Sequence, residues 1–161
     1  MDVKNKPETP LKWGLISTAR INRALIKPLR ASERNELAAV ASRTQESADQ
    51  YAAEWAVPQA FGSYQAMLDD PGIDVVYNSL PNSLHTEWTV KALQAGKHVL
   101  CEKPLAVTLE EVDAMQAAAD DSGKFLTEAF MYRHHPQTLR VKEMVEQGVV
   151  GNVQLVKGEF T

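Results

Sequence analysis

The fold is decided by one stretch in the second half of the chain, which reads Ala95-Gly96-Lys97-His98-Val99-Leu100-Cys101-Glu102-Lys103-Pro104-Leu105. Gly96 ends a helical pattern, and the mostly apolar residues 98–101 predict a short strand. Charged residues and a proline follow directly, so we expect the chain to leave this strand in a polar turn. A helix, a short strand and a polar turn in close succession are typical of an α/β protein.

The same alternation continues on both sides of this stretch. Short strands are predicted at residues 11–16, 37–41, 59–61, 73–78 and 124–127. Helices are predicted at 20–29, from Thr44 as N-cap to Trp55, at 64–68, from Asn82 or Ser83 as N-cap to Gly96, from a capping box at Thr108 to Ser122, and at 136–147. This order predicts an α/β fold with a doubly wound parallel sheet, covered by helices on both faces.

The loops after four of these strands are the expected site of the chemistry. A doubly wound sheet binds its ligands at the carboxyl ends of the strands, where the winding reverses. The residues that end these strands are Ile16, Ala41, Asn78 and Cys101. We therefore look for functional side chains directly after each of them.

Composition and charge exclude several classes of protein. The chain has 161 residues, of which 44% are hydrophobic and 24% charged, and its formal net charge is −4. This is the usual balance of a soluble globular domain, and no basic block indicates a nucleic-acid partner. The lone Cys101 fits a reducing compartment, and no stretch is apolar enough for a signal peptide or a membrane span. We therefore expect a cytoplasmic protein without a membrane contact.

Three segments form a further pattern along the chain. Residues 80–85 read Leu-Pro-Asn-Ser-Leu-His, residues 95–105 are quoted above, and residues 128–136 read Glu-Ala-Phe-Met-Tyr-Arg-His-His-Pro. In this order they resemble the P-N-x-x-H segment, the AGKHVxCEKP signature and the segment before the linking helix of the Gfo/Idh/MocA oxidoreductases. Residues 13–22 look most like the sugar and dihydrodiol dehydrogenase branch of that family.

The resemblance implies a domain organisation. Residues 1–10 are a polar leader, residues 11–133 a dinucleotide-binding Rossmann domain, and residues 134–150 a linking helix. Residues 151–161 begin a second α/β domain for substrate and oligomerisation, of which the chain holds only the first strand, predicted at 153–160. A lone strand cannot form a domain, so we expect the chain to be truncated and the full-length form to be a homo-oligomer through the missing domain.

The loop after the first strand departs from the usual phosphate-binding pattern. Rossmann loops read G-x-G-x-x-G, whereas the aligned positions here hold Ser17, Ala19 and Asn22. The helix dipole and the backbone amides remain, and hydroxyl groups add donors, although the methyl group of Ala19 should loosen or shift the cofactor. The alternative is an ordinary N-cap loop. The predicted cofactor-binding residues of this loop are Ser17, Thr18, Ala19, Arg20 and Ile21.

The end of the second strand indicates which dinucleotide binds. NAD enzymes place an acidic residue there for the ribose 2′-hydroxyl, whereas NADP enzymes prefer a positive group. Ser42 and Arg43 follow this strand, and no acid occurs before Glu46. Arg43 can pair with a 2′-phosphate and Ser42 can hydrogen-bond to it, so NADP is expected rather than NAD. The alternative is a solvated surface arginine.

The turn after the strand predicted at 98–101 carries the predicted catalytic residue. By resemblance, Lys103 is the catalytic lysine, Glu102 contacts the nicotinamide ribose, and a cis bond precedes Pro104. His85 lies close to the cofactor by the same resemblance, although a packed or helix-capping histidine is the alternative. The remaining predicted cofactor contacts are Leu80, Asn82 and Arg133.

No metal site is expected. His134 and His135 are adjacent, so their side chains point in opposite directions on an extended segment, and no Cys/His/carboxylate cluster accompanies them.

The leading hypothesis is an NADP-dependent oxidoreductase. It would transfer a hydride between the nicotinamide and a small substrate, namely a carbohydrate, a polyol-like compound or a dihydrodiol. Two alternatives stay open, namely a non-catalytic sensor that binds NAD(P), and an inactive fragment of such an enzyme. The Glu102-Lys103-Pro104 turn argues against a sensor, because a pure sensor has no need of the lysine.

Overall fold

The computed structural model describes residues 9–159, and most of the polar leader predicted at 1–10 lies outside this range. The chain divides into two compact units between Ala129 and Phe130. Six strands belong to the first unit: β1 (Leu11–Ile16), β2 (Asn35–Ala41), β3 (Gln59–Phe61), β4 (Val75–Asn78), β5 (His98–Cys101) and β6 (Leu126–Glu128).

The helices alternate with these strands. The α-helices are α1 (Arg23–Ala31), α2 (Gln45–Trp55), α3 (Tyr64–Leu68), α4 (His85–Gln94), α5 (Leu109–Ser122) and, in the second unit, α6 (Pro136–Glu146). Short 3-10 helices are η1 (Arg20–Asn22), η2 (Asn82–Leu84) and η3 (Met131–His134). Among the described residues, no helix has both the length and the apolar character that a membrane span requires.

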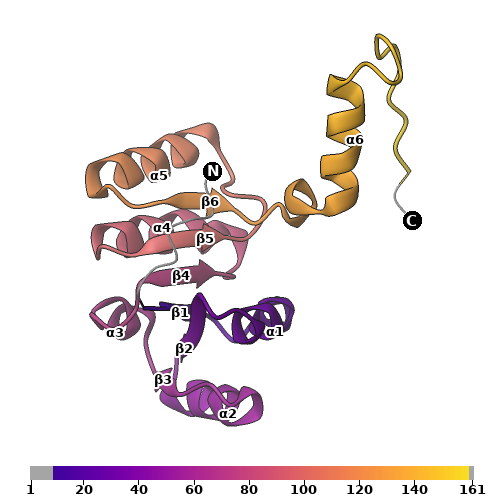
Figure 1. Ribbon diagram of the computed structural model, residues 1–161. Helices are drawn as coiled ribbons and strands as arrows, with labels where there is room; N and C mark the ends of the chain where they lie inside the picture. The colour runs from indigo at the N-terminus through magenta and orange to yellow at the C-terminus, as the bar shows by residue number, and fades with distance from the viewer. Residues whose placement is uncertain (1–8, 160–161) are drawn as a thin grey trace. The chain divides into compact units, whose positions relative to one another are not determined.

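All six strands form one parallel sheet in the order β3-β2-β1-β4-β5-β6, which Figure 1 shows. The sequence runs outward from β1 in one direction through β2 and β3, and then outward from β4 in the other. The winding therefore reverses between β1 and β4. The predicted doubly wound parallel sheet is confirmed, and its switch point lies between two buried central strands.

Each face of the sheet packs against its own helices. Leu15, Val40, Tyr77 and Leu100 face one cluster, which also holds residues of α1 and α2. Their sequence neighbours face the other cluster with α3, α4 and α5, and these include Ile16, Ala41, Val76 and Cys101. Alternate residues of a strand point to opposite faces, so strands buried on both faces read as the continuous apolar runs seen in the sequence.

Several predicted helix ends are confirmed, and one is wrong. The side chain of Thr44 accepts from the backbone amide of Ser47, and Thr108 forms the predicted capping box with Glu111. Neither Asn82 nor Ser83 caps α4 with its side chain, because these residues form the 3-10 turn η2 instead. The amide of Leu84 donates to the carbonyl of Pro81 at 2.8 Å, which closes this turn before α4 begins.

The strand predicted at 153–160 is also wrong within the described residues. Residues 153–159 have no regular secondary structure, and Phe160 lies outside the described range. A strand needs a neighbour to accept its hydrogen bonds, and the described part of the second unit contains no strand. The apolar sequence pattern alone could not supply that partner.

Gly62 tests the packing of α2 against the end of β3. A Cβ atom at this position would lie 2.9 Å from the backbone nitrogen of Gln45 and 3.0 Å from its Cα. Because backbone atoms cannot rotate away, Gly62→Ala should lower the free energy of unfolding by about 1–3 kcal/mol in urea titrations. Gly158→Ala is the control, since nothing lies within 4 Å of its added Cβ. Equal stabilities of the two variants would contradict this packing.

Candidate functional site

The carboxyl edge of the sheet fixes three predicted site residues by backbone hydrogen bonds. Ser17 donates its amide to the carbonyl of Ala41, and Ser42 donates to that of Phe61, both at 2.9 Å. Glu102 likewise donates to the carbonyl of Asn78 at 2.9 Å. Each bond extends the parallel ladder one residue beyond its strand. The loops therefore leave the sheet from defined positions.

An open cleft of about 520 Å³ lies at this edge. It brings together six predicted residues, namely Ser17, Thr18, Ala19, Ser42, Arg43 and Leu80. Sequence reasoning did not select five others that line it, namely Ser47, Tyr64, Ser79, Pro81 and Leu84. Pro81 and Leu84 belong to a segment already recognised at 80–85, whereas only the folded packing reveals Tyr64. The loops after β1, β2 and β4 thus form one cleft.

The cleft carries one positive charge. Of the described residues that line it, Arg43 is the only cation and none is acidic. Tyr64 packs edge-on against Trp88, with 5.0 Å between the ring centroids. Burial raises the pKa of Tyr64, and the positive charge of Arg43 opposes that rise. The arrangement suits an anionic group beside Arg43.

The 3-10 helix η1 follows the first of these loops. The first amides of a helix have no acceptor within it, so Arg20 and Ile21 at the start of η1 offer free backbone donors. Both residues line a separate hollow of about 320 Å³ together with Arg23 and Ala24. Arg20 and Ile21 are not among the residues that line the main cleft, although both were predicted as cofactor contacts.

The hydroxyl of Ser17, expected as a free donor to phosphate, points inward. Its Oγ lies 2.8 Å from Oγ of Ser79 and accepts the amide of Ala19 at 3.1 Å. Ser17 is only 9% exposed. Of the two hydroxyl groups expected to face a ligand, that of Thr18 has no such internal partner among the described residues.

Asn78, the last residue of β4, holds the loop that follows it. Its Nδ2 donates to the carbonyl of His85 and to Oγ1 of Thr89, both at 3.1 Å. Its Oδ1 accepts the amide of Leu80 at 3.2 Å. This buried side chain ties the 79–81 loop to the first turns of α4.

His85 is fully buried and connects two loops. Its Nε2 lies 2.8 Å from the carbonyl oxygen of Leu80, and its Nδ1 lies 2.9 Å from that of Pro104. A carbonyl only accepts, so a neutral ring makes one of these bonds and a doubly protonated ring makes both. Neither nitrogen is left for a ligand. The ring therefore positions the cleft loop relative to the turn after β5.

The carboxylate of Glu102 is positioned by Tyr77, a residue that was not predicted from the sequence. Oη of Tyr77 donates to Oε1 of Glu102 at 2.6 Å, and the amide of Lys103 donates to Oε2 at 3.2 Å. Burial and the adjacent carboxylate raise the pKa of Tyr77 well above its usual value, so it stays a donor. Lys103 is exposed, and the predicted cis bond before Pro104 is present.

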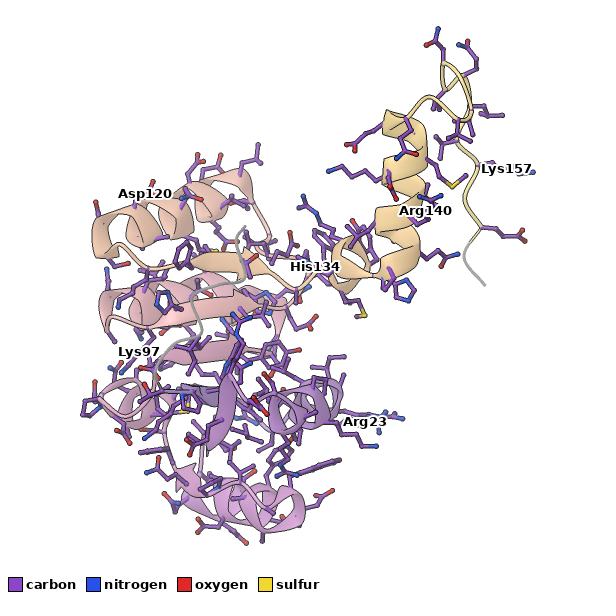
Figure 2. The ribbon with its side chains drawn as sticks, viewed as in Figure 1. Arg23, Lys97, Asp120, His134, Arg140 and Lys157 are labelled. Carbon is purple, nitrogen blue, oxygen red and sulfur yellow. The ribbon has the colours of Figure 1, made fainter. Side chains whose placement is uncertain are left out.

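The two lysines of the 95–105 stretch have different surroundings. Nζ of Lys97 donates to the carbonyl of Asp70 at 2.7 Å, and its side chain is buried. Burial lowers the pKa of Lys97, and the nearby Asp70 and Asp74 oppose that shift. Figure 2 shows Lys97 and Arg23 on the sides of the sheet where opposite ends of the strands lie. Lys97 therefore connects the amino end of β5 to the turn at Asp70, at the end of the strands opposite the cleft.

The remaining candidates differ in their placement. Asn82 is exposed at the start of η2, and Arg133 lies in η3 of the second unit, so the role of each stays a prediction. Burial raises the pKa of Cys101 to about 12, which agrees with an inert packed thiol. Within residues 9–159, no group of three His, Cys, Asp or Glu side chains is placed to hold a metal ion.

The family can be established from a comparison with known proteins. Residues 11–130 match the model of the Gfo/Idh/MocA oxidoreductase family, described as an NAD-binding Rossmann fold. The chain belongs to this family. The matched range contains all six strands and the whole cleft.

Individual relatives agree with this membership. D-xylose 1-dehydrogenase (NADP(+)) 2 of Haloferax volcanii is 44% identical over 146 residues, which cover 89% of this chain and 45% of that protein. The trans-1,2-dihydrobenzene-1,2-diol dehydrogenase of Danio rerio is 38% identical over 152 residues, 93% of this chain and 46% of that protein. The chain spans about half the length of these curated relatives.

Solved structures have the same fold. A 3-ketoreductase from Actinomadura kijaniata in complex with NADP is 37% identical, with a TM-score of 0.82 over 90% of this chain and 46% of that one. An NAD binding oxidoreductase from Klebsiella pneumoniae is 33% identical, with a TM-score of 0.83 over 88% of this chain and 40% of that one. Proteins similar to this chain are therefore named or solved with either dinucleotide.

His85→Ala tests the connection between the two loops. The variant leaves a cavity and removes the ring that lies between the carbonyl groups of Leu80 and Pro104, so the free energy of unfolding should fall by about 3 kcal/mol. His134→Ala is the matched control, because His134 is exposed and its side chain has no described partner; its effect should stay within about 0.5 kcal/mol. Urea unfolding measures both. A loss below about 1 kcal/mol for His85→Ala would refute the connection.

Proposed function

We propose that this chain is the cofactor-binding part of an NADP-dependent oxidoreductase that transfers a hydride between the nicotinamide and a carbohydrate, polyol-like or dihydrodiol substrate. The observation that carries the proposal is the cleft at the switch point between β1 and β4, where Arg43 is the single cation among the described lining residues and none of them is acidic. Doubly wound sheets bind dinucleotides at this position.

The residues present fit the dinucleotide. Arg43 and Ser42 would hold the 2′-phosphate of the adenosine ribose, because a guanidinium and a hydroxyl both donate to phosphate oxygens. The backbone amides of residues 18–21 would receive the pyrophosphate at the start of η1. Leu80 and the segment around Asn82 and His85 would border the nicotinamide half. The name of the Haloferax volcanii relative, with NADP(+), supports the choice of cofactor.

We assign the proton transfer to Lys103. The bound nicotinamide would supply or accept the hydride, and the oxygen of the substrate must gain or lose a proton at the same time. The amino group of Lys103 is exposed after β5 and has no described ion pair, so it is free to exchange that proton. Glu102, fixed by Tyr77, would accept a hydrogen bond from the nicotinamide ribose.

The substrate class rests on the relatives. The Haloferax volcanii and Danio rerio proteins are named for D-xylose and for a dihydrobenzene diol, both of which carry CH–OH groups. Residues 134–150 would link the Rossmann domain at 11–133 to a substrate and oligomerisation domain that begins at 151–161. The whole protein would be a homo-oligomer in the cytoplasm, and Arg133, at the end of the Rossmann domain, would be a further cofactor-binding residue.

Binding of NADPH and NADH to the purified chain tests the cofactor assignment. NADPH should bind more tightly, and Arg43→Ala should weaken NADPH binding by about 10- to 100-fold, because a charge-assisted bond to the 2′-phosphate is lost. NADH lacks this phosphate, so its affinity should change by less than about twofold. Nicotinamide fluorescence during titration gives the dissociation constants.

Arg34→Ala is the control for this experiment, because Arg34 is an exposed arginine outside the cleft. It should leave the affinity for both cofactors unchanged. Equal affinity for NADPH and NADH in the unmodified chain would contradict the assignment to NADP. Binding without oxidation of any sugar or diol by the full-length form would support the sensor alternative.

A further inference from the structure

Ser17 adopts a backbone conformation that normally calls for glycine. Its φ is +101°, within the region that side chains with a Cβ rarely occupy. Neither Ser17, Ala19 nor Asn22 is a glycine, so the loop lacks the residue type that tolerates this φ. Some other interaction must therefore hold the loop in this shape.

The side chains of two buried polar residues, Ser79 and Asn22, hydrogen-bond to the strained residue Ser17. Oγ of Ser79 lies 2.6 Å from Oδ1 of Asn22 and 2.8 Å from Oγ of Ser17. Nδ2 of Asn22 donates to the carbonyl of Ser17 at 2.8 Å. Ser17, Ser79 and Asn22 are 9%, 7% and 0% exposed. We call these three residues the serine–asparagine ring.

One arrangement of hydrogens satisfies the whole ring. An amide oxygen only accepts, so the single hydroxyl hydrogen of Ser79 goes to Asn22 Oδ1, its nearest acceptor. Ser17 then donates to Ser79, and the amide group of Asn22 donates to the carbonyl of Ser17. The ring closes on itself, and Ser17 Oγ also accepts the amide of Ala19. Such closed chains strengthen each bond in them.

We propose that the serine–asparagine ring replaces the missing glycines and holds residues 17–19 in the shape that presents the first amides of η1 to the pyrophosphate. This inference rests on the proposed dinucleotide site. Ser79 is the decisive member, because it comes from the loop after β4 and its hydroxyl joins Ser17 and Asn22 of the loop after β1. Ser79 is thus a positioning residue.

Ser79→Ala tests the ring through ligand binding. The variant should bind NADPH about tenfold more weakly, because the loop is no longer held in one shape. Adenosine 2′-monophosphate has no pyrophosphate and would contact only Ser42 and Arg43, so its affinity should change by less than about twofold. Ser122→Ala is the matched control, since the Ser122 hydroxyl donates to carbonyl groups within α5 and does not line the cleft; both affinities should be unchanged.

A double variant separates a positioning role from general packing. Glycine accepts the φ of residue 17 without help, so Ser17→Gly combined with Ser79→Ala should restore NADPH affinity to within about threefold of the unmodified chain. If the serines only stabilised the core, the double variant would bind no better than Ser79→Ala. That outcome would overturn the proposal.

Hydrogen exchange gives a measurement that needs no ligand. The amide of Ala19 donates to Ser17 Oγ, so it should exchange at least about fivefold faster in Ser79→Ala, while the amide of Leu15 in β1 is unchanged. Unchanged exchange at Ala19 would refute the ring. Exchange at Ala19 could be faster in Ser79→Ala while the unmodified chain binds neither NADPH nor adenosine 2′-monophosphate. That result would show that the ring stabilises the loop, but it would refute the dinucleotide site. The role proposed for the ring in cofactor binding would then be wrong.

Discussion

The parallel pairing of β1 with β4 is the constraint on which the site depends. Leu15 lies opposite Tyr77 and Ile16 opposite Asn78, so both strands end at the same level. Because β2 and β5 extend the sheet in opposite directions from this pair, no connecting helix crosses the gap between the two loops. Ser17 and Ser79, which are 62 residues apart in sequence, therefore meet as first neighbours.

Buried polar side chains convert this meeting point into a defined shape. Asn78 and His85 hold the loop after β4, and the hydroxyl of Tyr77 directs Glu102 after β5. Tyr77, Asn78 and His85 are not among the residues that line the cleft, so they shape it from behind its surface. The donor groups of the cleft's described lining are backbone amides, hydroxyl groups and one arginine, and all of these can donate to phosphate oxygens.

The sheet and six of the residues that line the cleft could be predicted from the sequence. Apolar runs and capping residues such as Thr44 and Thr108 act locally, so their effect can be read from neighbouring residues. The sequence was insufficient where tertiary contacts decide. The inward turn of the Ser17 hydroxyl requires Ser79, and the lining role of Tyr64 requires α3 to pack beside Trp88. The strand predicted at 153–160 failed for the same reason, because the pattern was present but no pairing strand was.

The most direct test of the account is a titration of the ¹⁵N-labelled chain with NADP⁺, followed by the shifts of its backbone amide signals. The account predicts the largest shifts at residues 18–21 and 42–43, with smaller ones at 79–84. It predicts none at the separate hollow near the amino end of β6, which is lined by Gln116, Ala119, Asp120 and residues 123–126. Shifts centred on that hollow, or no shift at the β1 loop, would contradict a dinucleotide site at the switch point.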